Sequence, residues 1–393
     1  MKMRVKFAAL AIPFLVAIPP LLSHEVVSTT VTFDREIVRI LAKKCIACHS
    51  ERNLGMPLTS YEQTRPWARS IEEEVLPRHM PPWRAMAGYG QFANDIGMSN
   101  REIQFIVAWV EGNGPRTKGE QVIANFGEAG KADDRLRPDF ERWQLGKPDL
   151  QVPLAPHSVD PSRVPSGRDE VRREIINLGL TSDAWVRALE FHPGDRRVVR
   201  TAYFSLQETG QWLGSWTPWY GVTTLPSNTA YRVPAGSHIV AEIHYRSTEE
   251  IAEDRSTLGV YLTPKAANRP VDLVVDTKAE GAPDGRVQKV YGSIKLAADA
   301  NLLAFKPEIP PGIESMDVTA RKPDGTVQVL LVVRHVLAEW PTPYILAQPV
   351  PLPKNTELAV NGYYDQAAAV TRDSLKLTVS LYNNAAPSAP QKR

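Results

Sequence analysis

Apolar residues between positions 33 and 115 recur at the spacing of amphipathic helices. Ile37, Ile40 and Leu41 share one face of a first helix, which ends at Lys43-Lys44, because lysines favour the negative end of a helix. Two later segments open with the spacing of a capping box, Thr59 with Glu62 and Ser99 with Glu102. Their apolar stripes are Trp67, Ile71 and Val75, and then Ile103, Ile106, Val107 and Val110. This part of the chain is therefore predicted to be a small all-α domain.

From residue 151 onward the pattern changes to short apolar runs rich in β-branched and aromatic residues, separated by proline and glycine turns. No helical period of useful length remains. The clearest runs are 185–191, 198–204, 239–245, 258–262, 273–275, 302–305, 327–333, 358–364 and 375–382. A stretch of this length is too long for one sandwich, so we expect two stacked β-sandwiches.

The N-terminus has the order of a secretory signal. Lys2, Arg4 and Lys6 precede an apolar run over 7–22, and a polar segment follows. The residues at 21–23 make a poor cleavage site, which leaves an uncleaved anchor as the alternative. We expect an exported protein, in the periplasm or on the extracytoplasmic face of a membrane. Membrane association would come through this N-terminus or through a partner.

These patterns divide the chain into six predicted parts. They are a signal peptide or anchor at 1–23, a helical domain at 24–117, a linker at 118–150, β-sandwiches at 151–264 and 265–385, and a loose tail at 386–393. Hydrophobic content of 43% and charged content of 23% are those of an ordinary globular protein. The net charge of +2, with no basic aromatic-rich patch, gives no sign of a nucleic-acid partner.

Cys45-Ile46-Ala47-Cys48-His49 is the strongest chemical motif of the chain. Thiols at this spacing can form thioethers with the vinyl groups of one haem, and the following histidine then becomes an axial ligand of the iron. The chain has only two cysteines, so the thiol ligands of a typical structural zinc site are incomplete. The flanks also lack the βαβ context of a thioredoxin-like pair. We therefore expect one covalent haem c, held by Cys45 and Cys48 and ligated by His49.

Met80 is the expected second axial ligand, because Pro81-Pro82 directly after it stiffens the loop and removes backbone donors. The alternatives that the sequence leaves open are Met56, Met86, Met98 and His79. A histidine and methionine pair favours reduced iron and leaves no open coordination position. Such an iron suits electron transfer.

The helical region with its haem motif resembles a class I cytochrome c. Nearly the whole chain after the signal resembles a bacterial exported family that joins such a domain to a module similar to the copper type II, ascorbate-dependent monooxygenases, relatives of peptidylglycine α-hydroxylating monooxygenase. The motifs that carry this resemblance are residues 45–49, 58–62, 65–68, 80–83, 108–110, 143–149, 185–188, 191–194, 234–237, 243–245 and 323–325. It implies a multidomain fold, an all-α cytochrome c domain followed by tandem jelly-roll-like sandwiches.

Most copper ligands that the resemblance implies are missing. Arg200-Thr201 stands where the family has a histidine pair, and only His244 matches the third ligand of that site. Glu308 and Pro310 hold the positions of the second copper's histidines, and the run at 375–382 has no methionine. One imidazole does not hold copper, which needs about three nitrogen or sulfur donors. We expect no copper, with His244 a weak candidate that could regroup with His192, His238 or His335.

The sequence thus predicts an electron-transfer protein rather than an enzyme, a partner or subunit of a membrane-associated redox complex. The β module would serve for docking, and the aromatic residues Trp212, Trp216, Trp219 and Tyr220 are candidates for an exposed loop at that interface. The interpretation that we favour for these rings is that they cover other parts of the same chain. The alternative functions are a copper-dependent monooxygenase with a remodelled site around His244, a structural subunit, and a peroxidase with an open haem.

Overall fold

The computed structural model describes residues 28–117, 142–163, 169–281, 286–337, 340, 342–369 and 375–383. The predicted signal segment, most of the predicted linker and the predicted tail lie outside these ranges. The described chain is mostly β, with several sheets, as the sequence predicted. None of its described helices has the length and apolar character needed to cross a membrane.

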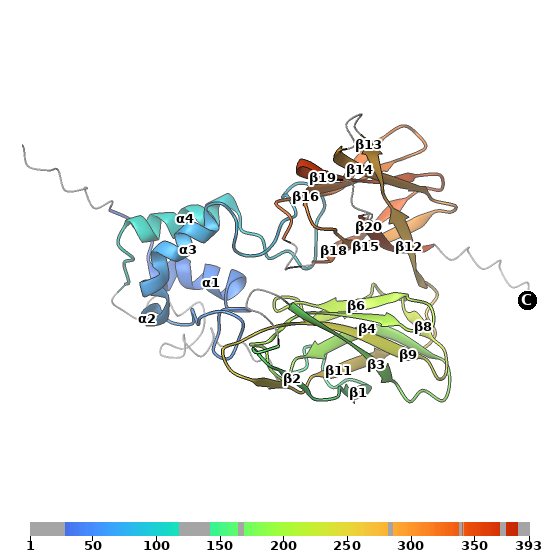
Figure 1. Ribbon diagram of the computed structural model, residues 1–393, viewed down its shortest axis with the longest axis horizontal. Coiled ribbons are helices and arrows are strands. Elements are labelled where there is room, and N and C mark those ends of the chain that lie inside the picture. Colours follow the sequence, from blue (N-terminus) through green and yellow to red (C-terminus); the bar gives the residue numbers. More distant parts are fainter. Residues whose placement is uncertain are drawn as a thin grey trace, which may run out of the picture.

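The helices occupy the N-terminal part of the described chain (Figure 1). They are η1 (Phe33–Ile37), α1 (Val38–Lys44), α2 (Tyr61–Thr64), η2 (Arg65–Trp67), α3 (Ala68–Val75) and α4 (Asn100–Glu111). Their buried side chains form one hydrophobic cluster, in which Ile37, Leu41, Ile106 and Trp109 are almost fully buried.

The two predicted helix starts differ in outcome. The Ser99 and Glu102 capping box is present on α4, as predicted. The prediction of Thr59 as the cap of the earlier helix was wrong, because Ser60 is extended and accepts a hydrogen bond from Gln63 N at 3.2 Å. Thr59 Oγ1 donates to Gln63 Oε1 at 2.7 Å instead.

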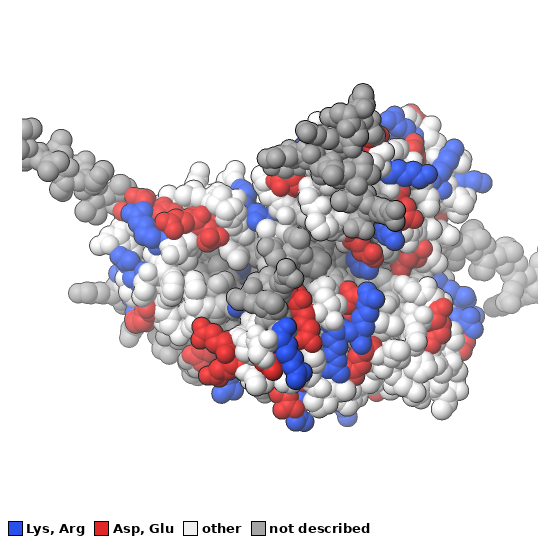
Figure 2. Space-filling view, viewed as in Figure 1, with Lys and Arg blue, Asp and Glu red and all other residues white. Residues whose placement is uncertain are grey.

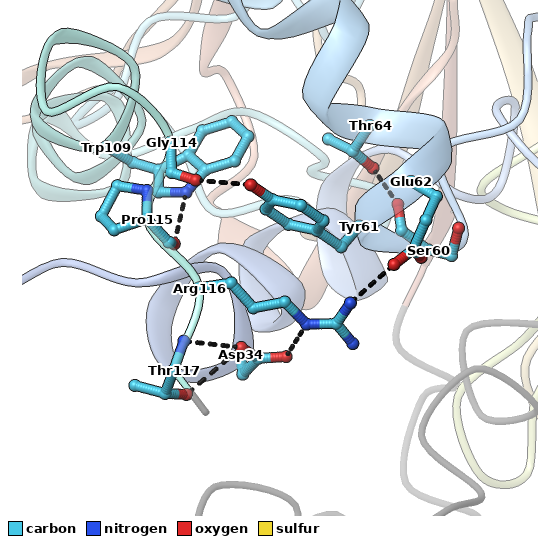
Figure 3. Close-up of polar contacts among 10 residues, drawn as sticks. All are labelled: Asp34, Ser60, Tyr61, Glu62, Thr64, Trp109, Gly114, Pro115, Arg116 and Thr117. Atoms are coloured by element: carbon cyan, nitrogen blue, oxygen red, sulfur yellow. Dashed lines mark hydrogen bonds and ion pairs between the residues drawn. The ribbon is translucent and has the colours of Figure 1, made fainter. Parts of the chain in front are cut away.

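The chain beyond α4 is tied back to the first helix (Figure 3). Arg116 forms ion pairs with Asp34 at 3.4 Å and with Glu62 at 2.7 Å, and Thr117 N donates to Asp34 Oδ2 at 3.1 Å. Trp109 Nε1 donates to the Pro115 carbonyl at 3.1 Å. These contacts hold the two ends of the helical region together around its core.

The first β-sandwich contains β1 to β11. Their bounds are β1 (Leu150–Pro153), β2 (His157–Val159), β3 (Asp169–Asn177), β4 (Ala184–His192), β5 (Val199–Leu206), β6 (Trp212–Trp216), β7 (Val222–Thr224), β8 (Tyr231–Val233), β9 (His238–Arg246), β10 (Ala252–Asp254) and β11 (Thr257–Leu262). One sheet runs β1-β11-β4-β7, with β8 also on β4, and the other runs β3-β9-β5-β6. The alternating burial along β9 places every second side chain in the core that the two sheets share.

The second β-sandwich contains β12 to β20. Their bounds are β12 (Pro270–Asp276), β13 (Lys278–Gly281), β14 (Arg286–Lys295), β15 (Ala300–Glu308), β16 (Ile313–Arg321), β17 (Val327–Arg334), β18 (Tyr344–Leu352), β19 (Glu357–Ala369) and β20 (Lys376–Asn383). Its sheets run β12-β20-β15-β18 and β13-β14-β19-β16-β17. A small cluster in which Trp212 of β6 meets Leu303, Ile345 and Tyr382 joins the two sandwiches.

The segment between α3 and α4 leaves the helices and packs on the second sandwich, as Figure 1 shows. Trp83, Phe92 and Ile96 belong to the hydrophobic core of that sandwich. Asn94 is buried, donates through Nδ2 to the Pro343 carbonyl at 2.7 Å and accepts from Ile345 N through Oδ1 at 3.0 Å. Hydrogen bonds from the Asn94 side chain to backbone groups of the second sandwich therefore hold the helical region against the β part.

The charged side chains show no field of one sign on the face seen in Figure 2, where Lys and Arg are interleaved with Asp and Glu over the described surface. Many of them form pairs, such as Arg173 with Glu242 at 2.7 Å. This arrangement agrees with the small net charge of the sequence.

Candidate functional site

The haem motif forms a tight turn directly after α1. Cys45 N donates to Leu41 O at 2.9 Å, and the amides of Cys48 and His49 both donate to Cys45 O, at 3.0 and 2.9 Å. This turn presents both thiols and the imidazole to one apolar cavity of about 270 Å³. The cavity is lined by residues 44, 45, 48, 49, 54–56, 58, 70, 71, 74, 75, 80–82, 96, 246 and 340.

The His49 ring is fixed by its neighbours. Its Nδ1 lies 3.1 Å from the Met56 carbonyl oxygen, an interaction that orients the ring and leaves Nε2 for a metal. Gly55 is required beside it, since a Cβ there would lie 2.4 Å from Nδ1. Burial lowers the pKa of His49, and this favours the neutral imidazole that a metal needs.

Both cysteines are free thiols in the structure. Burial raises the pKa of Cys45 and of Cys48 to about 12, so both stay protonated at neutral pH. A raised thiol pKa does not favour disulfide exchange, which needs the thiolate.

The residues predicted as candidates for a second axial ligand lie in different places. Met80 and Met56 both line the cavity, whereas Met98 is buried in the helical core. Met86 is exposed, and its amide donates to Val332 O at 2.8 Å. His79 pairs with Glu74 at 3.5 Å and is not among the lining residues.

Two side chains from the β part also border this cavity, and the sequence did not identify either. Arg246 ends β9, and its Nη1 donates to the Leu54 carbonyl at 2.9 Å. The second is Trp340, whose ring lies 5.3 Å from the Arg200 guanidinium carbon. No local pattern marks either residue, because tertiary packing alone brings them to the motif.

The histidines of the weak copper candidate lie apart, each beside a carboxylate of its own. His244 Nε2 lies 3.2 Å from Glu242 Oε1, and this hydrogen bond, together with the pair to Arg173, lowers the pKa of Glu242 to about 2. The others are His192 with Glu190, His238 with Glu208 and His335 with Glu314. Within the described residues, no three His, Cys, Asp or Glu side chains are grouped to hold a metal. The copper prediction itself stays a prediction.

The aromatic residues expected in an exposed loop are mostly internal. Trp212 and Trp216 begin and end strand β6 and are only 4% and 2% exposed. Trp219 Nε1 donates to the Asn94 carbonyl at 3.1 Å, on the segment that leaves the helices. The loop interpretation was wrong, and the rings cover other parts of the same chain.

Comparison with known proteins gives no assignment. No protein-family model matches the chain, and no curated protein matches it. The major capsid protein P2 from bacteriophage PM2 aligns with 58% of this chain and 97% of its own, at 10% identity and a TM-score of 0.28. PNGF-II aligns with 72% of this chain and 71% of its own, at 10% identity and a TM-score of 0.27. Likenesses this weak carry no argument about fold or function.

Proposed function

We propose that the chain is an exported monohaem c-type cytochrome that transfers single electrons. The observation that carries this proposal is that Cys45, Cys48, His49 and Met80 border one apolar cavity. The spacing of the thiols, the orientation of the imidazole and the apolar lining all fit a covalently attached haem. When bound, that group supplies a one-electron iron couple.

Each residue of the site has a role in this proposal. Cys45 and Cys48 would hold the haem covalently, each through a thioether formed by addition of its S–H group to a vinyl group. His49 would bind the iron through Nε2, since Nδ1 faces the Met56 carbonyl. Leu58, Ile71 and Val75 are apolar and exclude water from the site.

Met80 is the better of the two methionines for the second axial position. The Met56 backbone contacts the His49 ring itself, so Met56 belongs to the side of the site that the histidine occupies. Met80 comes from the far end of α3, where its amide donates to Glu74 O at 3.1 Å. Met80 is 39% exposed and lines the same cavity as Cys48 and His49.

The finer architecture follows from the same proposal. The helical region would be a class I cytochrome c domain, and the two sandwiches would be a jelly-roll-like module related to copper monooxygenases. In this proposal the module holds no copper and serves to dock the cytochrome on a redox partner or membrane-bound complex. The rival function is a copper-dependent monooxygenase around His244.

Production of the full chain in a bacterium that matures c-type cytochromes tests the proposal. We expect pigment that stays with the polypeptide on a denaturing gel, a low-spin six-coordinate absorption spectrum, and iron equimolar with the chain. The matched control is the Cys45→Ser, Cys48→Ser double variant, which should be colourless on the gel. A colourless wild-type chain would contradict the proposal, and stoichiometric copper would favour the monooxygenase.

A further inference from the structure

We propose that Arg246, a residue of the first β-sandwich, binds a carboxylate side chain of the haem and so completes the pocket from outside the helical region. The inference rests on the function proposed above and extends it, since it gives the β module a direct part in holding the cofactor. It is carried by the position of Arg246, by its surroundings and by the balance of charge beside the cavity.

Hydrogen bonds hold both the backbone and the side chain of Arg246. Its backbone amide donates to Val198 O at 2.8 Å, and its Nη1 donates to Leu54 O at 2.9 Å, across to the loop after the haem motif. The same side chain lines the cavity together with Cys48 and His49. The bond to Leu54 uses one of several N–H donors that a guanidinium offers, and the fork geometry of this group suits a carboxylate.

The charges beside this end of β9 leave room for an anion. Asp169 on β3 is the cross-strand partner of Arg246 and forms an ion pair with Arg200 at 3.1 Å, so this one carboxylate acts on two arginines. Burial and then the nearby Arg200 lower the pKa of Arg246, Asp169 raises it, and the net shift is downward, so the charged form is disfavoured. A further carboxylate would offset that cost, because buried charges are stable when they are paired.

The other charged residues at the cavity are less suited to this role. Glu74 is itself acidic and pairs with His79. Lys44 donates through Nζ to the Gly97 carbonyl, and it directly precedes Cys45. Its ammonium is thus held by the segment between α3 and α4, and it lacks the planar fork of a guanidinium. Arg246 comes from a different module, and Trp340, whose ring lies beside the Arg200 guanidinium, lines the same cavity.

The test uses the full-length holoprotein with Arg246→Gln and Arg246→Lys. The matched control is Arg173→Gln, which removes an exposed arginine of the neighbouring strand from its pair with Glu242. Resonance Raman spectra report the bending band of the haem carboxylates, and spectroelectrochemical titration reports the ratio of reduced to oxidised haem at a fixed potential. Covalent haem content is measured on every variant.

We expect Arg246→Gln to shift the carboxylate band and to lower the ratio of reduced to oxidised haem about threefold or more, because a buried positive charge favours the reduced iron. Arg246→Lys should keep most of the ratio but shift the band, since it keeps the charge and loses the fork. The control should change neither. If Arg246→Gln does not mature, the band of Arg246→Lys decides.

An unshifted band in the haem-loaded Arg246 variants, with an unchanged ratio, would overturn the inference and leave the proposed function intact. A wild-type chain without covalent haem would overturn both. The two failures are therefore distinguishable by the haem content of the wild-type protein.

Discussion

The Nδ1 atom of His49 lies 3.1 Å from the carbonyl oxygen of Met56, and this one contact decides which ring nitrogen faces the cavity. A carbonyl oxygen can only accept a hydrogen bond, so Nδ1 of the neutral ring carries the proton and Nε2 is unprotonated. Because Gly55 has no side chain, the ring can occupy this position. The turn after the cysteines thus holds the His49 ring in the orientation that the proposed axial ligation needs.

Removal of this ring should change the haem without releasing it. We expect His49→Ala to lose the low-spin spectrum, while Cys45 and Cys48 still retain the pigment on a denaturing gel. The matched control is His79→Ala, because His79 is exposed and is not among the residues that line the cavity. A low-spin His49→Ala protein would show that another residue ligates the iron.

The choice between the two methionines can be decided by spectroscopy. We expect Met80→Ala to abolish the methionine-to-iron absorption band of the oxidised protein and to lower its reduction potential, since a thioether ligand favours reduced iron. Met56→Ala should leave the band in place. The reverse pattern, with the band lost only in Met56→Ala, would assign the second ligand to Met56.

Added bulk beside the histidine should displace it. In Gly55→Ala the new Cβ would lie 2.4 Å from His49 Nδ1. We expect the free energy of unfolding to fall by about 1–3 kcal/mol, as at other overpacked sites. Gly221→Ala is the control, because its Cβ would meet nothing closer than 3.5 Å. Chemical denaturation of both variants measures the effect, and equal stabilities would contradict the crowding at Gly55.

The anchor between the helical region and the second sandwich rests on Asn94. We expect Asn94→Ala to cost about 2–4 kcal/mol, because it leaves the buried Ile345 amide and Pro343 carbonyl without their partner. Asn94→Asp keeps the acceptor for Ile345 and loses only the donor. Denaturation followed by β-sheet circular dichroism measures both, and a wild-type stability for Asn94→Ala would refute the anchor.

The pair of Glu242 and His244 should make the free energy of unfolding depend on pH in the acidic range. The pKa of Glu242 falls from 4.5 to about 2 in the folded state, so its contribution is full above pH 4.5 and is lost as the pH falls toward 2. We expect the His244→Ala variant to be less stable than the wild type at neutral pH. Between pH 4.5 and 2 its stability should fall by less than that of the wild type. Denaturation at several pH values tests this, with Glu242→Gln expected to flatten the same window.

The parts of the fold that could be predicted from the sequence depend on neighbouring residues. The Ser99 cap of α4 forms within one turn of helix, and the alternation along β9 follows from one buried face. Strand β6 has no such alternation, because one face lies in the first sandwich and Trp212 on the other meets the second sandwich. The sequence therefore predicted a loop here, because Gly214 and Pro218 are residue types common in turns.

The site divides in the same way. Cys45, Cys48 and His49 are adjacent in sequence, so their common cavity could be anticipated from their spacing. Met80 lies beyond α2, η2 and α3, and its proline neighbours made it a candidate from the sequence. Arg246 and Trp340 lie far along the chain in other modules, and only the packing of the β part against the motif brings them there.

The most direct test of a covalent haem is the mass of the intact wild-type chain under denaturing conditions, after production in a host that matures c-type cytochromes. For the wild type we expect the mass of the polypeptide plus one haem, with no free thiol. The Cys45→Ser, Cys48→Ser variant should have the mass of the bare polypeptide. A wild-type mass equal to the bare polypeptide, with both thiols free to react, would contradict the covalent haem.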